Sequence, residues 1–292
     1  MLSDSQIKDL ELKAVAIRES IIEMLVAAGS GHTAGPLGMA DIFTAMYFHM
    51  LNHDPKNPDW SERDRLILSN GHIVPVRYAT MAHAGYFPVA ELLTLRKFGS
   101  RLQGHPERHA LPGLENTSGP LGSGLSQASG MALGLRMDTA SLKLRSASPR
   151  VYCCMSDGEL DEGNSWEAIM FAGNRKLNNL TAIIDRNNIQ IDGTTESVMP
   201  LEPLADKWRA FNWHVIEIDG HNFNEIVDAV NQAKAITEKP TVIIAHTIPG
   251  KGISEIEFDF KWHGTPPNAE QAQVWLKELR TLQDKIEGGH LD

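Results

Sequence analysis

The stretch "VYCCMSDGELDEG", residues 151–163, places an apolar run directly before a turn that is rich in carboxylates and glycine. About thirty residues later, "IIDRNNIQIDG", residues 183–193, repeats this order with two asparagines behind the apolar run. Each run has the length and composition of a strand that is buried on both faces. In parallel sheets built from such strands, ligands bind beyond the carboxyl ends. The two turns are therefore the first candidates for a binding site.

The rest of the chain repeats the alternation of strands and helices. Short apolar runs predict strands at 65–69, 151–155, 181–185, 215–219 and 241–246. Helical spacing of apolar residues predicts helices at 5–28, 38–51, 123–138, 165–175 and 223–236. This order predicts an α/β fold with a parallel sheet and helices on both faces. After the break at 264–267 we expect a polar helix at 269–286, so residues 1–265 form one α/β domain and 266–292 a helical tail.

Composition excludes several classes of protein. The chain has 292 residues, 42% of them hydrophobic, and a formal net charge of −10 without a Lys/Arg cluster, so we expect no nucleic-acid partner. No apolar run reaches the length of a membrane span, and the mixed-charge start resembles no targeting signal. Cys153 and Cys154 are strand neighbours that point to opposite faces, which disfavours a disulfide. We therefore expect a cytoplasmic protein without membrane contact.

Asp157 and Asn187 are the candidate metal ligands. Each follows a predicted strand, so neighbouring strands would bring both side chains into one crevice. A carboxylate, an amide oxygen and a backbone carbonyl make half of the octahedral oxygen shell that Mg²⁺ prefers. Gly158 lets the backbone approach a phosphate closely. The alternative is that Asp157-Gly158 and Asn187-Asn188 merely form turns.

Histidine is abundant, and its placement is the second chemical signal. The chain has 12 histidines, and five of them directly follow glycine: His32, His72, His105, His221 and His290. Imidazoles can remove and return hydroxyl protons near pH 7, as catalysis on sugars requires. A lone Gly-His pair is weak evidence, because most single histidines are structural or exposed. We interpret His221, in "DGHNF", as structural.

The motif "SDGELDEG…LNNLTAIIDRNNIQIDG" resembles the thiamine diphosphate motif of the transketolase family, with Ser156 in place of its first glycine. "SGHTAGPLG", "LSNGH", "LQGHPE", "SGPLGSG" and "KWHG" follow in the order seen in transketolases, over residues 10 to 265. The resemblance implies the family's thiamine diphosphate-binding fold. It also implies that Asp157, Asn187 and the Ile189 carbonyl bind Mg²⁺, or Ca²⁺ in its place, and that Gly158 and Glu159 belong to the cofactor site.

The same resemblance assigns the remaining site residues. His32 and His105 would contact sugar hydroxyls and share proton transfers, and His72 and His263 would also touch the diphosphate. Gly119 and Leu121 would pass close to the cofactor. Two departures put sugar specificity in doubt: Thr33 stands where the family usually has proline or a similar residue, and "NGHIVPVRYA" replaces a more apolar stretch after His72.

Glu162 opens the predicted helix at 165–175, where a carboxylate favours the positive helix end. By the resemblance, this glutamate belongs to a carboxylate network between two active sites at a subunit interface. Trp166 and Met170 follow on one helical face and are candidates for the same contact, with core packing as the equal alternative.

The resemblance also implies a missing part. In full transketolases a downstream domain supplies the glutamate that contacts the cofactor's aminopyrimidine, and it grips the sugar phosphate. We therefore expect the N-terminal subunit of a split transketolase, active only with a C-terminal partner in a heterotetramer with two copies of each chain. It would move a two-carbon ketol unit from a ketose phosphate to an aldose phosphate. Alternatives are a paralogue for a branched or sulfonated sugar, 1-deoxyxylulose-5-phosphate formation, or a non-catalytic regulatory subunit.

Overall fold

The central sheet has five parallel strands in the order β1-β2-β3-β7-β6, in a computed structural model that describes residues 1–142 and 149–289. For residues 139–142 only the backbone is described. The strands are β1 (Arg65–Leu68), β2 (Val151–Ser156), β3 (Leu180–Arg186), β6 (His214–Asp219) and β7 (Thr241–His246). All five predicted strands are present, and the predicted α/β class is confirmed. The register Ser156↔Asp185 places the carboxyl ends of β2 and β3 side by side.

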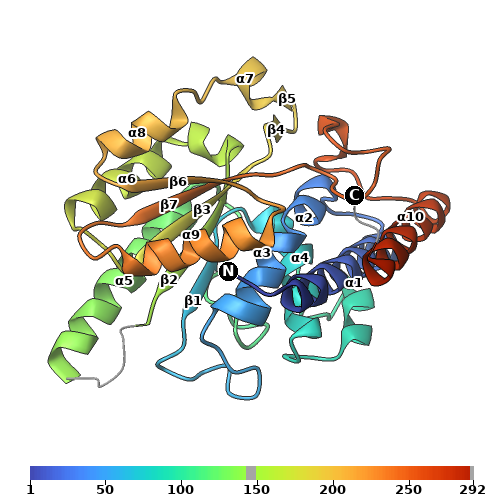
Figure 1. Cartoon of the computed structure of the whole chain (residues 1–292), viewed down its shortest axis with the longest axis horizontal. Coiled ribbons are helices and arrows are strands. Elements are labelled where there is room, and N and C mark those ends of the chain that lie inside the picture. Colours follow the sequence, from blue (N-terminus) through green and yellow to red (C-terminus); the bar gives the residue numbers. More distant parts are fainter. Residues whose placement is uncertain (143–148, 290–292) are drawn as a thin grey trace.

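Helices cover both faces of the sheet (Figure 1). The first layer contains α1 (Asp4–Ala28), α3 (Ala40–Ala45), α4 (Val74–His83), α9 (Phe223–Ala235) and α10 (Ala269–Gly288). The second layer contains α5 (Ser123–Leu142), α6 (Gly163–Asn174) and α8 (Leu204–Ala210). Shorter elements are α2 (Ala34–Gly38), α7 (Thr195–Val198), the hairpin β4 (Ile189–Gln190) and β5 (Gly193–Thr194), and η1 (Met46–Met50), η2 (Gly71–Ile73), η3 (Val89–Thr94), η4 (Gly158–Asp161) and η5 (Phe260–Trp262).

Two hydrophobic cores lie on opposite faces of the sheet, because successive side chains of a strand alternate. Cys154 belongs to the core under α1 and α4, and Cys153 to the core under α5 and α6. Both thiols are free and buried, and burial raises the pKa of Cys154 to about 12. The prediction that the two cysteines point apart without a disulfide is confirmed.

The edge strand β6 departs from the expected pattern. It is only partly buried, and Glu217 and Asp219 on it are exposed. The inner strands β2, β3 and β7 are buried almost throughout because each has a strand on both sides and helices over both faces. An edge position therefore explains why a charged residue interrupts this run.

The predicted helix at 38–51 is wrong in its bounds. The chain instead forms α2, then α3, then the π-helical turn η1, so the helix begins earlier and is interrupted at Met39. Gly38 packs so tightly that an added Cβ would lie 2.9 Å from the Ile248 carbonyl oxygen. The helix α4 was not predicted. It is buried along almost its whole length, Arg77 and Thr80 included, so no exposed polar face marks it as a surface helix.

The C-terminal helix α10 packs along α1 (Figure 1). It begins with a capping box between Asn268 and Gln271, and it buries Trp275 and Leu279 in the first core. The ring of Trp275 meets Trp262 at 5.0 Å between centroids. The division of the chain at residue 265 stays a prediction.

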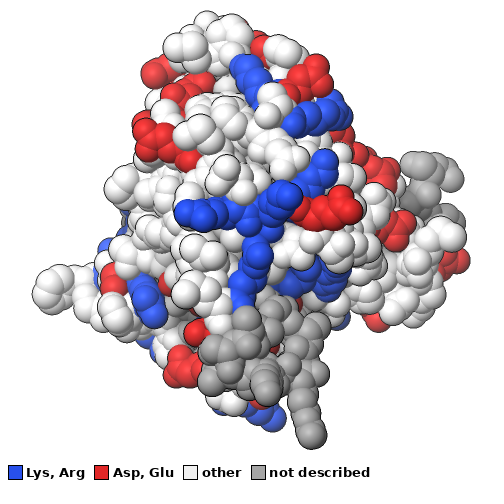
Figure 2. All heavy atoms as spheres, turned by 90° about the vertical axis from the view of Figure 1, so that its left-hand side faces the viewer, with Lys and Arg blue, Asp and Glu red and all other residues white. Residues whose placement is uncertain are grey.

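Charge is unevenly spread over the surface. Figure 2 views the molecule from the left-hand side of Figure 1, where blue basic side chains gather near the centre of the face with red acidic ones around them. Arg136, on α5, donates to the carbonyl oxygens of Arg175 and Lys176, and so joins α5 to the end of α6. In the described ranges, no helix has the length and apolarity needed to cross a bilayer.

Candidate active site

Four histidines line one cavity beyond the carboxyl ends of β1 and β2. The ring centroid of His32 lies 5.0 Å from that of His72, 5.5 Å from His263 and 6.4 Å from His105. The cavity has a volume of about 300 Å³, within the range of small-molecule sites. The structure therefore brings together, from four distant segments, the four histidines that the resemblance assigned to the site.

Short turns hold these rings in place. His32 follows the turn that ends α1, His72 lies in η2 directly behind β1, and His263 directly follows η5. Gly71 is required for this packing, since a Cβ there would lie 2.3 Å from Ser118 Oγ and 3.1 Å from the His105 ring. The Gly-His order thus has a steric reason at residues 71–72.

Burial lowers the pKa of all four imidazoles. For His32, burial followed by the nearby charges of His263, His105 and Arg96 lowers the pKa to about 4. Burial and the other histidines hold the pKa of His72 well below its usual value, and burial followed by Arg96 lowers the pKa of His105. Burial also lowers the pKa of His263. At pH 7 the cluster is neutral, so each ring can accept a proton at one nitrogen and donate at the other.

Several buried polar atoms around the cavity have no hydrogen-bond partner among the described residues. They include Nδ1 of His32, Nδ1 of His263, Oγ of Ser118 and both side-chain polar atoms of Asn70. Buried polar groups in folded proteins are normally hydrogen-bonded. The cavity therefore fits a ligand that brings polar atoms of its own.

A buried carboxylate fastens the glycine-rich wall of this cavity. Glu159 accepts hydrogen bonds from the Ser69 hydroxyl, from the Gly122 N–H at 2.5 Å and from the Ser156 N–H at 3.2 Å. Burial raises its pKa to about 6. Gly119 faces open space, with no atom within 4 Å of an added Cβ. Glu159, Gly119, Leu121 and Gly158 all line the cavity, as expected for the predicted cofactor group.

The predicted metal ligands lie at the adjoining ends of β2 and β3. Asp157 is fully buried, and its Oδ2 accepts the Asn188 N–H at 2.7 Å, which joins the two turns directly. Asp157 Oδ1 accepts the Gly158 N–H, and Asn187 Oδ1 accepts the Ile189 N–H at 3.0 Å. The turn bonds of the alternative interpretation are therefore present. They coexist with a carboxylate, an amide oxygen and a carbonyl on adjoining turns.

This donor set suits a hard cation. Among the described residues, no three His, Cys, Asp or Glu side chains gather as a metal cluster. The predicted set has only one carboxylate, and its other oxygens come from the amide of Asn187 and the main chain of Ile189. Mg²⁺ and Ca²⁺ accept such mixed oxygen ligands and complete their shells with phosphate and water. The metal itself stays a prediction.

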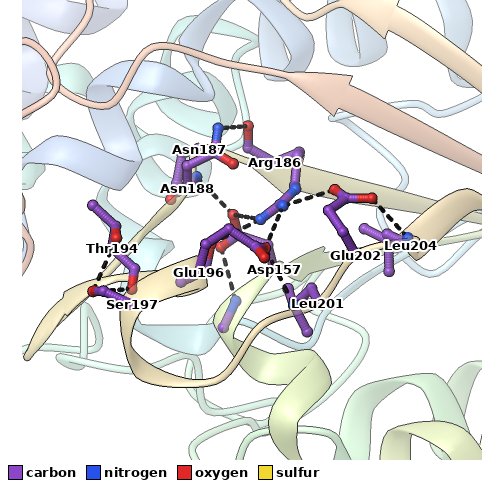
Figure 3. A network of polar contacts seen from close by, with 12 residues as sticks. Asp157, Arg186, Asn187, Asn188, Thr194, Glu196, Ser197, Leu201, Glu202 and Leu204 are labelled. Carbon is purple, nitrogen blue, oxygen red and sulfur yellow. Dashed lines mark hydrogen bonds and ion pairs between the residues drawn. The ribbon is translucent and has the colours of Figure 1, made fainter.

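Arg186 is a site residue that the sequence reasoning missed (Figure 3). Its buried guanidinium lies 3.2 Å from Asp157 Oδ2 and also binds Thr195, Glu196 and Glu202, each at 2.9 Å. Burial raises the pKa of Asp157 to about 6, against the opposing effect of Arg186 and two backbone N–H donors. A signal was available, because a basic residue at the end of an apolar buried run needs carboxylate partners.

Glu162 lies outside the cavity. It is the exposed N-cap residue of α6 and makes no capping bond with its side chain. Trp166 packs against Trp208 and Phe211 and donates to the Leu160 carbonyl, which supports core packing for this residue. Met170, by contrast, is 55% exposed and remains available for a contact.

His221 is structural, as predicted. Its ring contacts Asp41 Oδ2 at 2.7 Å and accepts the Ile248 N–H at 2.8 Å, and these bonds fasten three segments behind the cavity. His290 lies outside the described residues.

Comparison with known proteins finds relatives over nearly the whole chain. The family described as "Transketolase, thiamine diphosphate binding domain" matches residues 11–281. The chain is 45% identical over 278 residues to the 6-deoxy-6-sulfo-D-fructose transketolase subunit SqwG of Clostridium sp. (strain MSTE9), covering 95% of this chain and 98% of the relative. It is 39% identical over 282 residues to one subunit of the apulose-4-phosphate transketolase of Phocaeicola vulgatus, covering 97% and 98%.

Larger relatives match over part of their length. Rattus norvegicus transketolase is 40% identical over 279 residues, which cover 94% of this chain and 42% of that protein. The solved transketolase from Leishmania mexicana superposes with a TM-score of 0.86 at 31% identity, over 99% of this chain and 46% of the other. Since the family match spans most of the sequence and the fold agrees, the chain belongs to the transketolase family as a thiamine diphosphate-binding domain.

Proposed function

We propose that this chain is the cofactor-binding subunit of a two-chain transketolase and works only with a C-terminal partner chain. The relatives matched from end to end are named as subunits, whereas the chain spans less than half of the larger transketolases. The observation that carries the proposal is the cavity of four neutral histidines beside the Asp157 turn. A heterotetramer with two copies of each chain would give the closed symmetry typical of such enzymes.

The residues present fit thiamine diphosphate and a divalent cation. Asp157, Asn187 and the carbonyl of Ile189 would hold Mg²⁺, or Ca²⁺ in its place, and the metal would neutralise the diphosphate. Gly158, Gly119, Leu121, His72 and His263 would surround the cofactor. The bound cofactor supplies the carbon that carries the ketol unit.

The chain itself manages protons. His32 and His105 face the same cavity as neutral imidazoles, so each can accept a hydroxyl proton from a sugar and return it. A subunit with only a regulatory or binding role would not need these two rings, because the diphosphate is held elsewhere. This supports a catalytic role over the regulatory alternative.

For the sugar, we favour an unusual substrate over the ordinary ketose phosphates expected first. The end-to-end relatives are named for 6-deoxy-6-sulfo-D-fructose and for apulose-4-phosphate. The departures at Thr33 and behind His72 lie beside the cavity and agree with a changed substrate. The transfer is still a two-carbon ketol transfer between a ketose and an aldose.

The test is co-expression with a partner chain from a neighbouring reading frame, which should encode the domain that supplies the glutamate for the cofactor's aminopyrimidine. Purified complex and purified single chain are assayed with thiamine diphosphate, Mg²⁺ and a panel of ketose donors and aldose acceptors, including sulfonated and branched sugars. We expect turnover by the complex alone. Robust turnover by the single chain contradicts the two-chain proposal, and a preference for ordinary pentose phosphates contradicts the substrate assignment.

A further inference from the structure

The segment that carries His263 is a closed turn with one side-chain link to the rest of the cavity. The Asp259 carboxylate accepts the Lys261 N–H, the His263 N–H donates to the Phe260 carbonyl, and the Thr265 hydroxyl donates to the Lys261 carbonyl at 2.8 Å. These bonds close residues 259–265 into a compact unit with His263 inside it. A unit closed in this way moves as one piece.

The link comes from the residue that follows His32. The Thr33 hydroxyl donates to the Thr265 carbonyl at 2.7 Å, and Thr33 itself is completely buried. Gly264, directly after His263, packs on the ring of His32, since an added Cβ would lie 3.8 Å from His32 Nε2. The bond therefore joins the two imidazole-bearing turns where they touch.

Within the described ranges, no second hydrogen bond from outside the turn reaches residues 263–265. At the other end of the turn, Trp262 packs against Trp275 of α10. An aromatic contact resists separation, but it directs rotation less strictly than a hydrogen bond does. At the start of the turn, the Asp259 N–H donates to the Ile256 carbonyl. The Thr33 bond is therefore the directional anchor at the His263 end of the turn in the described part of the chain.

We propose that Thr33 is a positioning residue whose hydroxyl fastens the His263 turn to the His32 turn and so fixes the separation of the two rings. The consequence for catalysis rests on the proposed function. The link between the turns does not.

The matched variants are Thr33→Val, which keeps the shape and removes the donor, and Thr33→Ser, which keeps the donor. Thr80→Val is the control, because the Thr80 hydroxyl also donates to a main-chain carbonyl at 2.7 Å in a buried place, inside α4. Hydrogen exchange of the peptide covering residues 258–266 is measured on the full chain alone, with circular dichroism to verify folding. We expect exchange of this peptide to be up to about tenfold faster in Thr33→Val, because the variant loses one hydrogen bond. We expect exchange near the wild-type rate in Thr33→Ser and Thr80→Val.

Exchange in Thr33→Val that matches Thr80→Val overturns the inference, whatever the enzyme does. If Thr33→Val does not fold, hydrogen exchange of residues 258–266 is measured in Thr33→Ala instead. Faster exchange than in Thr80→Val supports the inference, and equal exchange overturns it. With the partner chain added, we expect Thr33→Val to lower kcat up to about tenfold with little change in the KM of the donor, and Thr33→Ser to restore kcat. A wild-type complex that turns over no sugar, together with faster exchange in Thr33→Val, overturns the proposed function and supports the Thr33 link.

Discussion

At the scale of single residues, Asp157 shows how one carboxylate can serve a turn and a predicted metal site together. Its two oxygens accept the N–H groups of Gly158 and Asn188, and Arg186 lies beside it. A carboxylate has about four acceptor positions, so these three donors leave room for a cation. Arg186 in turn is balanced by Glu196 and Glu202, which prevents its charge from acting on Asp157 alone.

Two alanine substitutions separate metal binding from proton transfer. We expect Asp157→Ala to abolish Mg²⁺-dependent binding of thiamine diphosphate, because the only carboxylate of the predicted set is lost. We expect His105→Ala to leave binding intact and to lower kcat of the complex by roughly 10²–10⁴-fold. Calorimetry measures the binding, and steady-state kinetics the turnover. The exposed neighbour His109→Ala is the control, and equal loss of cofactor binding in both variants would contradict this division of roles.

His32 gives a prediction for the pH dependence of stability. Burial, more than any other cause, lowers the pKa of its imidazole from the ordinary value of 6.5 to about 4 in the folded chain. Below pH 6.5 the unfolded state therefore binds more protons, so the free energy of unfolding falls as the pH drops from 7 to 4. Relative to His32→Asn, we expect the wild type to lose up to about 3 kcal/mol over this range.

Urea unfolding at pH 7, 5.5 and 4.5 measures this difference, with His109→Asn as the exposed control. A gap between wild type and His32→Asn that does not change with pH would show that the His32 ring is solvated in the folded state.

At the scale of elements, α10 shows that a polar helix can still belong to the core. Its sequence predicts an exposed face, and the capping box at Asn268 marks its start. Its inner face nevertheless buries Trp275 and Leu279 against α1. Burial of one apolar face in this way contributes most of the stability of a helix in a folded protein.

Truncation of Leu279 tests whether α10 unfolds with the rest of the chain. We expect Leu279→Ala to lower the free energy of unfolding by about 2–5 kcal/mol, through lost burial and the cavity left behind. Val274→Ala, on the exposed face of the same helix, should change it by less than about 0.5 kcal/mol. Chemical unfolding followed by circular dichroism compares the two. A separate early transition that alone responds to Leu279→Ala would support residues 266–292 as an independent tail.

At the scale of the whole molecule, the histidine cavity opens on a chain that spans 46% of a solved transketolase. The cavity walls come from the turns behind the strands and from the His263 turn. In the described structure, unpartnered polar atoms of His32, Asn70, Ser118 and His263 lie around it. A second chain would complete such a site, and exposed apolar residues are the candidates for its contact. Met170 on α6 is one of them.

Met170 therefore tests the position of the contact with the partner chain. We expect Met170→Asp to weaken assembly with that chain roughly tenfold or more, because a carboxylate would be desolvated in the contact. Val274→Asp, an equally exposed apolar position on α10, is the control. Analytical ultracentrifugation of titrated mixtures measures the affinity. Unchanged assembly in Met170→Asp would place the contact away from this face of α6.

The sequence alone predicted the parts of this protein that depend on local pattern. Apolar runs located all five strands of the sheet, and alternation placed Cys153 and Cys154 on opposite faces, because strand geometry forces that outcome. The family resemblance of the motifs around the four histidines, together with the Asp157 and Asn187 turns, marked residues that the fold gathers at one end of the sheet. Helix bounds were less certain, as the interruption at Met39 shows.

Only the tertiary structure decided how these residues are held. The Thr33 bond to Thr265 and the Arg186 contacts with Glu196 and Glu202 are invisible to periodicity. So is the lowered pKa of His32, which arises from burial among rings supplied by distant segments. The physical reason is that a repeating pattern reports which face of an element is buried. The partners of a side chain, and the charges around it, are fixed only when separate elements pack together.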